Sequence, residues 1–191
     1  MFEWRRGGIR WRVSLLFPAL VTALLLQQPD GVAVGCILAS LLHEGGHLAA
    51  MLLLGCPPHS FTVGAFGARL EMGETALAGY RRNILISLAG PAVNFSAAGL
   101  FLALSQAEAA AVHLSLGVFN LLPAAPLDGG QVLRCILCLA GQETRAERLL
   151  RWLSAAVMLP LASLAALTAL EGGNHTLLIV SGYLAALTFF S

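Results

Sequence analysis

The chain has 191 residues, of which 58% are hydrophobic and only 11% are charged. A soluble globular domain has about 45–50% apolar and about 25% charged residues, so this composition excludes an ordinary soluble domain and a disordered chain. The net charge of +1, without a basic patch, also excludes a nucleic-acid-binding protein. At about 20 residues per spanning helix, we expect an all-α polytopic membrane protein. About six transmembrane helices would form a single domain over residues 1–191.

The chain begins with a basic segment that contains Arg5, Arg6, Arg10 and Arg12, followed by an apolar run over residues 13–26. A signal peptide shows the same order of features. No small-x-small cleavage site follows the apolar run, which favours a short first membrane span. The second span is expected over residues 31–55.

The segment between the second and third spans is the longest polar-leaning stretch. Apolar and polar residues alternate over 59–72, and Gly64 and Gly67 lie where a hairpin would turn. We therefore expect a small membrane-associated β-hairpin. We also expect it to pair with an extended substrate by strand addition, with Phe66 among its anchoring residues. An ordinary cytoplasmic loop is the alternative.

The remaining spans are separated by short polar segments. Prolines and glycines interrupt the fourth span, and an apolar stretch then continues it. The expected spans are 83–105, 109–122 with a continuation over 131–140, 152–170 and 175–190, with a polar connector at 141–151.

The arginines indicate the orientation of the chain. All 11 cationic residues are arginines, and with a cytoplasmic N-terminus every one of them falls on the cytoplasmic side. The outer loops then carry only Asp30, Glu108 and Glu171. Because cytoplasmic loops are enriched in positive charge, we expect a multi-pass protein of the cell membrane with both termini in the cytoplasm.

Few charged or ionisable residues lie within the expected spans, and such residues mark functional sites by default. His43, Glu44 and His47 form an HExxH motif in the second span. On a helix, residues four apart lie on one face, so two imidazoles can bind one zinc ion. Glu44 lies about 100° further round the helix, in the position of the general base of a zinc peptidase. A chance match and a structural hydrogen-bonded cluster are the alternatives.

A catalytic zinc site has three protein ligands, and Asp128 is the candidate for the third. It follows the segment PAAPL at 123–127 and precedes Gly129 and Gly130. Irregular backbone of this kind is tolerated within a membrane only where it is buried in protein or lines a watery cavity. The alternative is that Asp128 caps the helix that begins after it.

Other polar residues within the spans have weaker assignments. Asn120 and Asn94 are candidates for binding substrate, and interhelical hydrogen bonds are the alternative for each. His113 is expected toward the outer side and is not expected to bind the metal. Cys135 and Cys138 have redox spacing, but simple packing is the expected role of a single CxxC in an apolar helix.

Three motifs together resemble the site-2 protease family of intramembrane zinc metalloproteases, peptidase family M50. They read HEGGH at 43–47, GPAVN at 90–94 and NLLPAAPLDG at 120–129. Their order and spacing are most similar to the compact bacterial branch that includes the stage IV sporulation protein FB. That branch usually carries a C-terminal CBS domain, and other branches carry a PDZ domain. This chain ends at Ser191 with neither, so ATP sensing through a CBS domain and PDZ gating are not expected.

The resemblance implies a zinc endopeptidase that acts in regulated intramembrane proteolysis, as in sporulation. Its substrate would be a membrane-tethered protein, such as a sigma-factor precursor or an anti-sigma factor, cut near the cytoplasmic face. A membrane regulatory partner is also implied. The alternative is a membrane zinc transporter or a non-catalytic metal-binding scaffold. A transporter would favour repeated halves, which the sequence lacks, and would have no need of Glu44 beside His43.

Overall fold

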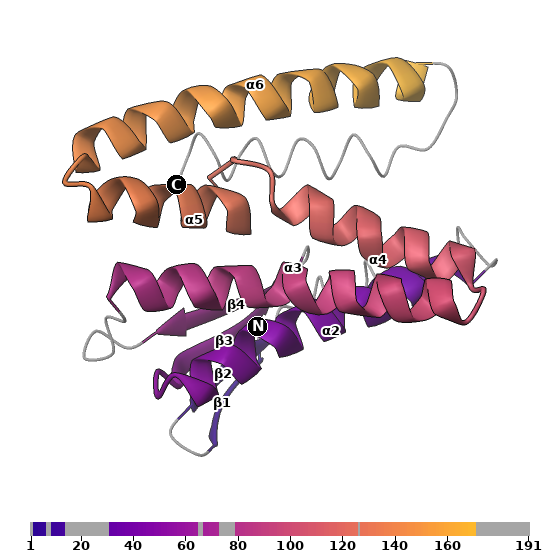
Figure 1. Ribbon diagram of the computed structural model, residues 1–191, viewed down its shortest axis with the longest axis horizontal. Coiled ribbons are helices and arrows are strands. Elements are labelled where there is room, and N and C mark those ends of the chain that lie inside the picture. The colour runs from indigo at the N-terminus through magenta and orange to yellow at the C-terminus, as the bar shows by residue number, and fades with distance from the viewer. Residues whose placement is uncertain are drawn as a thin grey trace. The chain divides into compact units, whose positions relative to one another are not determined.

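The computed structural model describes residues 2–6, 9–13, 31–64, 67–72, 79–125 and 127–170 (Figure 1). The chain divides into two compact units, Met1–Val118 and Phe119–Ser191, which we describe in turn.

Two long helices pack along each other in the first unit. They are α2 (Val32–Leu53) and α3 (Tyr80–Ala103), close to the expected second and third spans. Among the described residues, only these two helices are long and apolar enough to cross a membrane. Only 28% and 39% of their most apolar windows are buried, whereas a core helix of a soluble protein would be mostly buried. Their exposure favours a membrane location.

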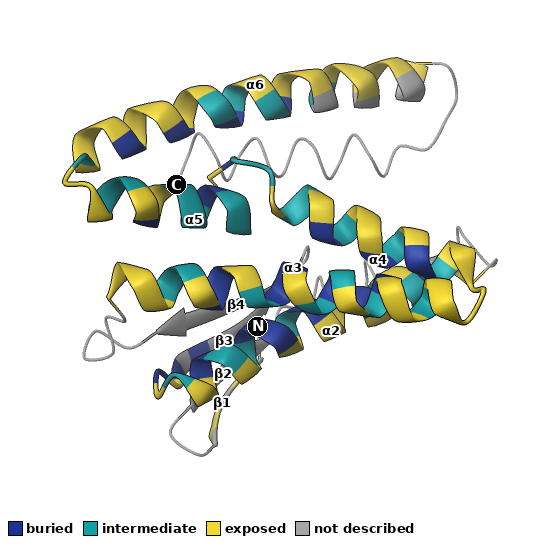
Figure 2. Cartoon of the chain, in the orientation of Figure 1, coloured by how far each residue is buried: buried dark blue, intermediate teal, exposed yellow. Residues whose placement is uncertain are grey.

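The buried and exposed faces of α2 differ in a way that is typical of membrane helices (Figure 2). The buried face carries small and polar residues, including Ala39, Gly46 and the two histidines. The exposed face carries large aliphatic side chains: Val34, Leu38, Leu41, Leu42, Leu52 and Leu53. Small residues let helices approach closely in lipid, whereas an exposed apolar surface of this kind would be costly in water.

A four-stranded sheet accompanies these helices. Its strands are β1 (Phe2–Arg6), β2 (Ile9–Val13), β3 (Pro58–Gly64) and β4 (Gly67–Met72), in the order β1-β2-β3-β4. β1 pairs with β2 and β3 with β4 in antiparallel fashion, while β2 and β3 run parallel. The expected strand-like segment at 59–72 is therefore the β3–β4 part of a larger sheet.

The expected all-α class with about six spans and an isolated hairpin is wrong. The N-terminal residues that we interpreted as the basic flank of a span instead form two strands, one of which pairs with β3. Pairing between segments so far apart leaves no local pattern in the sequence. The structure shows two helices of spanning character within the described residues. The expected first and sixth spans fall largely or wholly outside these residues.

The later helices also explain the lower number of spans. α4 (Ala107–Asn120) has 14 residues and α5 (Asp128–Leu139) has 12, whereas a spanning helix needs about 20. The connector expected at 141–151 is mostly helical, because α6 (Glu143–Leu170) already begins within it. The expected fifth span, residues 152–170, forms the C-terminal part of this helix.

In the second unit, α5 and α6 pack against each other after a tight turn at Gly141, whose φ is +69° (Figure 1). The irregular residues 121–125 and 127 precede α5 and contact α6. Ala124 and Leu127 share a buried cluster with Met158, and the backbone N–H of Ala125 donates to Oγ of Ser154 at 2.8 Å. The backbone that leads into α5 is thereby fixed to α6.

Candidate metal centre

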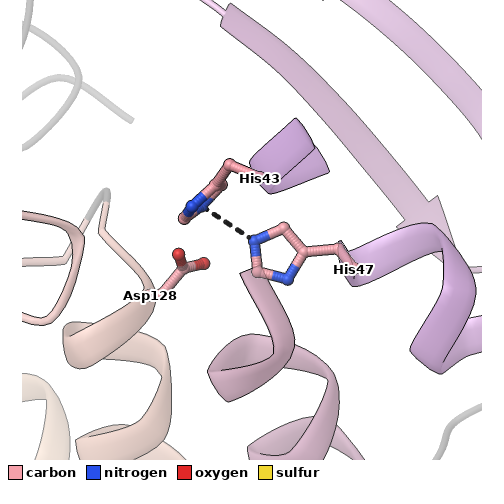
Figure 3. Close-up of side chains that lie close together, drawn as sticks. All are labelled: His43, His47 and Asp128. Carbon is pink, nitrogen blue, oxygen red and sulfur yellow. Dashed lines mark hydrogen bonds between the residues drawn. The ribbon is translucent and has the colours of Figure 1, made fainter. Parts of the chain in front are cut away.

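His43 and His47 lie one turn apart on α2 and project from its buried face (Figure 3). Their residues are only 5% and 8% exposed, and their Nε2 atoms lie 3.1 Å apart. Two nitrogens that bind one tetrahedral zinc at 2.0–2.1 Å are about 3.3 Å apart. The two imidazoles are therefore already close to the separation that a shared zinc ion requires.

The backbone of α3 holds His47 in a metal-binding tautomer. Nδ1 of His47 lies 2.7 Å from the carbonyl oxygen of Ile86. A carbonyl only accepts hydrogen bonds, so Nδ1 carries the proton and donates it to Ile86. Nε2 then presents its lone pair on the side that faces His43. Metal-binding histidines are commonly fixed in this way by a backbone carbonyl.

A side chain of α3 contacts His43. The fully buried Asn94 on α3 places Nδ2 3.1 Å from Nδ1 of His43. On its other side, Oδ1 of Asn94 lies 3.4 Å from Nδ1 of His113, which is also buried. We predicted that Asn94 binds substrate; the structure places its amide against the imidazole of His43. The sequence offered no sign of the contact with His113.

Gly90 leaves the space that the two imidazoles fill. A Cβ at this position would collide with Nε2 of His47 and would lie 2.8 Å from Nε2 of His43. Gly46 has a comparable role in the packing of α2 on α3, because a Cβ there would lie 2.8 Å from the carbonyl oxygen of Ala89. The expectation that the glycines of the HExxH motif allow close approach of another helix is confirmed for Gly46. Gly45 is exposed and has open space around it.

Glu44 is partly buried and follows His43 directly on α2. Its carboxylate therefore leaves the helix about 100° away from the His43 side chain. This is the direction expected of a base that acts beside the metal rather than as a third ligand on the same face. Its catalytic role stays a prediction.

Asp128 is the first residue of α5 and is partly buried. The N-cap of α5 is Leu127, so the alternative role of Asp128 as N-cap is not observed. The two glycines after it pack tightly on the preceding segment: a Cβ at Gly129 would collide with the carbonyl oxygen of Leu121, and one at Gly130 with that of Ala124. Among the described residues, the group that could hold a metal ion is the predicted one: His43, His47 and Asp128 (Figure 3).

The structure describes one of the two remaining substrate-binding candidates. Asn120 is the last residue of α4 and is partly buried. Phe66 lies outside the described residues. Cys135 is buried, and both it and Cys138 are free thiols, in keeping with the packing role expected for them.

The fold and the donor groups are those of a mostly helical protein with two long apolar helices and a candidate metal site of two histidines and one carboxylate. The sequence model of Peptidase family M50 matches residues 106–162. A Mycobacterium tuberculosis protein named as a zinc metalloprotease, Rip3, is 34% identical over 139 residues, which cover 63% of this chain and 34% of that protein. A Synechocystis protein named as a zinc metalloprotease, sll0528, is 29% identical over 146 residues, with 69% and 34% covered.

The chain spans about a third of the length of these two relatives. The solved structure of the Site-2 Protease from Methanocaldococcus jannaschii has the same fold. Its TM-score is 0.69 at 22% sequence identity, and the match covers 96% of this chain and 92% of that one. Together the comparisons confirm the resemblance to the site-2 protease family, and both sequence relatives are named as zinc metalloproteases.

Proposed function

We propose that this chain carries the catalytic centre of an intramembrane zinc endopeptidase. His43, His47 and Asp128 would hold the zinc ion, and Glu44 would be the general base. The observation that carries the proposal is the convergence of two buried Nε2 atoms, 3.1 Å apart, on a helix of membrane-spanning character. Buried imidazoles so close together, on an apolar helix with a carboxylate beside them, suit metal-assisted hydrolysis.

The zinc ion would supply Lewis acidity, which polarises a scissile carbonyl and makes water more acidic. Glu44 takes a proton from the attacking water and later gives it to the leaving amine. Asn120 donates a hydrogen bond to the substrate. Glu44 acts on an apolar helix, where little water competes for the polar groups.

The proposed substrate is a membrane-tethered protein, such as a sigma-factor precursor or an anti-sigma factor, cut near the cytoplasmic face. Arg69, Arg81 and Arg82 lie between α2 and α3 or at the start of α3, whereas the opposite ends of these two helices carry no arginine, which supports this orientation. His47 lies six residues before the end of α2, a distance of about 9 Å along the axis. Products would therefore leave on the cytoplasmic side, and a membrane regulatory partner would control access.

Glu44→Gln tests the proposal, because glutamine preserves the shape of the side chain but cannot act as a base. We expect purified Glu44→Gln to retain its zinc and to cleave single-span fluorescent peptides in proteoliposomes about 10²–10⁴-fold more slowly. Glu108→Gln is the control, because Glu108 is an exposed acid at the start of α4.

Cleavage by Glu44→Gln at the wild-type rate would contradict the role of Glu44. A zinc transporter would behave differently. The wild type would then move zinc across the proteoliposome membrane without cleaving any peptide, and Glu44→Gln would keep that flux.

A further inference from the structure

The two faces of the four-stranded sheet carry residues of opposite chemical character. Residues along a strand alternate between the faces, and residues paired across neighbouring strands share a face. The strand register therefore assigns each paired residue to one face. Two rows of one face are entirely apolar, and Arg6 and Ile9 follow them next to the β1–β2 turn. The apolar rows are Phe2–Val13–Val63–Ala68 and Trp4–Trp11–Phe61–Leu70.

The opposite face of the sheet carries four arginines. Glu3 and Arg5, in β1, are exposed, whereas Ser60, in β3, is only 3% exposed. This face is therefore open to its surroundings at the β1 edge. Its two rows are Glu3–Arg12–Thr62–Arg69 and Arg5–Arg10–Ser60–Glu71, and we call Arg5, Arg10, Arg12 and Arg69 the arginine face.

The charges of the arginine face do not balance across β1 and β2. Arg12 lies directly opposite Glu3, which is a favourable cross-strand pair, but Arg5 lies directly opposite Arg10. Like charges at directly opposite positions destabilise a sheet. An anion from outside the chain would relieve this repulsion, and guanidinium groups bind phosphate through paired charge-assisted hydrogen bonds. The register thus favours a phosphate-bearing ligand at Arg5 and Arg10.

The position of the sheet in the chain indicates where that phosphate would come from. β3 and β4 lie in the connection between the end of α2 and the start of α3, the two helices of membrane-spanning character. The first turn of α3 carries Tyr80, Arg81 and Arg82, all exposed. Tyrosine and arginine at the end of an apolar helix are typical of the membrane–water interface. The sheet therefore belongs at a membrane surface, where lipid phosphates are abundant.

We propose that the arginine face binds the phosphate groups of anionic phospholipids, while the apolar rows of the opposite face enter the adjoining acyl region. A sheet with one aromatic and one basic face suits the interface for the same reason as an amphipathic helix. In the proposed orientation this surface is the cytoplasmic one, where anionic lipids attract basic segments. An acidic protein segment could neutralise the arginines, but it would not account for the two tryptophans of the apolar rows.

Tryptophan fluorescence of the full chain in lipid vesicles tests the proposal. In Trp152→Phe the emission comes only from Trp4 and Trp11, because the chain has three tryptophans. Two samples contain the same mixture of phosphatidylcholine and phosphatidylglycerol, and an equal amount of one lipid or the other carries brominated acyl chains, which quench tryptophan. We expect stronger quenching by brominated phosphatidylglycerol, because each arginine favours an anionic surface by about fivefold.

Equal quenching by the two brominated lipids would overturn the proposal. If a glutamate-rich peptide also bound the chain in these vesicles, the arginine face would be assigned to a protein partner instead. Both leaflets have the same composition, so the result does not depend on the orientation of the chain.

Added salt separates the contributions of the two faces. In about 1 M salt the Debye length falls to about 3 Å, so the excess quenching by phosphatidylglycerol should fall to a small fraction. Quenching by brominated phosphatidylcholine should remain, since salt does not screen the contact of apolar residues with acyl chains. An excess that salt leaves unchanged would contradict the role of the arginines, and absence of quenching by either lipid would contradict the insertion of the apolar rows.

Substitution of the opposed arginines provides a second test in the same vesicles. Arg5→Gln combined with Arg10→Gln should lose most of the excess quenching, whereas Arg5→Lys combined with Arg10→Lys keeps both charges and should retain it. Arg145→Gln combined with Arg148→Gln is the matched control, because it changes the net charge equally at exposed positions on α6. An undiminished excess in the first variant, or an equal loss in the control, would overturn the proposal. These measurements involve neither zinc nor cleavage, so their failure would leave the proposed function standing.

Discussion

The proposed metal ligands lie in two regions with different kinds of backbone. One region is the α2–α3 contact, and the other is the segment that joins α4 to α5. On α2, His43 and His47 project from an uninterrupted helix, and α3 meets them at Gly90. Asp128 instead starts a new helix after an irregular segment, which contacts α6 through a buried apolar cluster and one side-chain hydrogen bond. Both regions have glycines where a Cβ would collide with a neighbour.

The atoms that a new side chain would meet differ between the two regions. At Gly90 they are the tips of the two imidazoles, which can move by rotation about side-chain bonds. At Gly129 and Gly130 they are backbone carbonyls, which move only if the segment itself is displaced. We therefore expect substitutions in the first region to affect metal binding more than stability, and substitutions in the second to affect both.

Gly90→Ala should have the largest effect on metal binding. Its methyl group would displace both imidazoles from their shared position, so we expect zinc affinity to fall by about 100-fold, at the upper end of the outer-shell range. Thermal stability should change little. Gly99→Ala is the control on the same helix, because nothing lies within 4 Å of a Cβ at that position. Equal zinc affinity in the two variants would contradict the role of Gly90.

Gly129→Ala should weaken zinc binding and also reduce stability. Its Cβ would collide with the carbonyl oxygen of Leu121, so the segment before α5 must shift. Overpacking of this kind costs about 1–3 kcal/mol, and displacement of Asp128 should lower zinc affinity about 10-fold or more. Thermal unfolding and dye competition on the same sample measure both effects. Lower zinc affinity at unchanged stability would remove the distinction between the two regions.

Gly46→Ala should have an intermediate effect on the helix pair. A Cβ at Gly46 would lie 2.8 Å from the carbonyl oxygen of Ala89 and 2.9 Å from Cγ2 of Val93, so α2 and α3 must separate by a few tenths of an ångström. We expect a loss of about 1–2 kcal/mol in stability. Gly45→Ala, beside it and in open space, should be neutral or slightly stabilising because alanine favours helix. Equal stability of both variants would show that the helices do not meet at Gly46.

Ser154→Ala should have the smallest effect. It removes the acceptor for the backbone N–H of Ala125 and should cost about 1 kcal/mol, with only a few-fold loss of zinc affinity. Ser163→Ala is the control, since the exposed hydroxyl of Ser163 bonds only within α6. A loss of zinc binding as large as that in Gly90→Ala would mean that the segment before α5 depends on this single hydrogen bond.

The sequence predicted the features that repeat along a helix. Apolar runs located α2 and α3 to within a few residues, and the four-residue spacing placed His43 and His47 on one face. Prolines and glycines located the irregular segment before α5. Each of these signals is local, because it depends on residues within one or two turns of each other.

The sequence could not predict which faces of distant helices meet. The contact of Asn94 with His113 depends on how α3 and α4 pack, and the parallel pairing of β2 with β3 depends on strands far apart in the chain. The clearance at Gly90 was missed for the same reason, since it depends on how α3 packs against the histidines of α2. Short helices such as α4 and α5 were merged into a full span because apolar composition alone does not report helix length.

X-ray absorption at the zinc edge of the purified wild-type chain tests the central claim most directly. We expect about one zinc per chain, with the scattering of two imidazoles, oxygen ligands at about 2.0–2.2 Å and no sulfur. In Asp128→Ala the imidazole scattering should persist while zinc affinity falls. Zinc bound through sulfur, or a wild-type spectrum without the paired imidazoles, would contradict the assignment of His43, His47 and Asp128 as the metal centre.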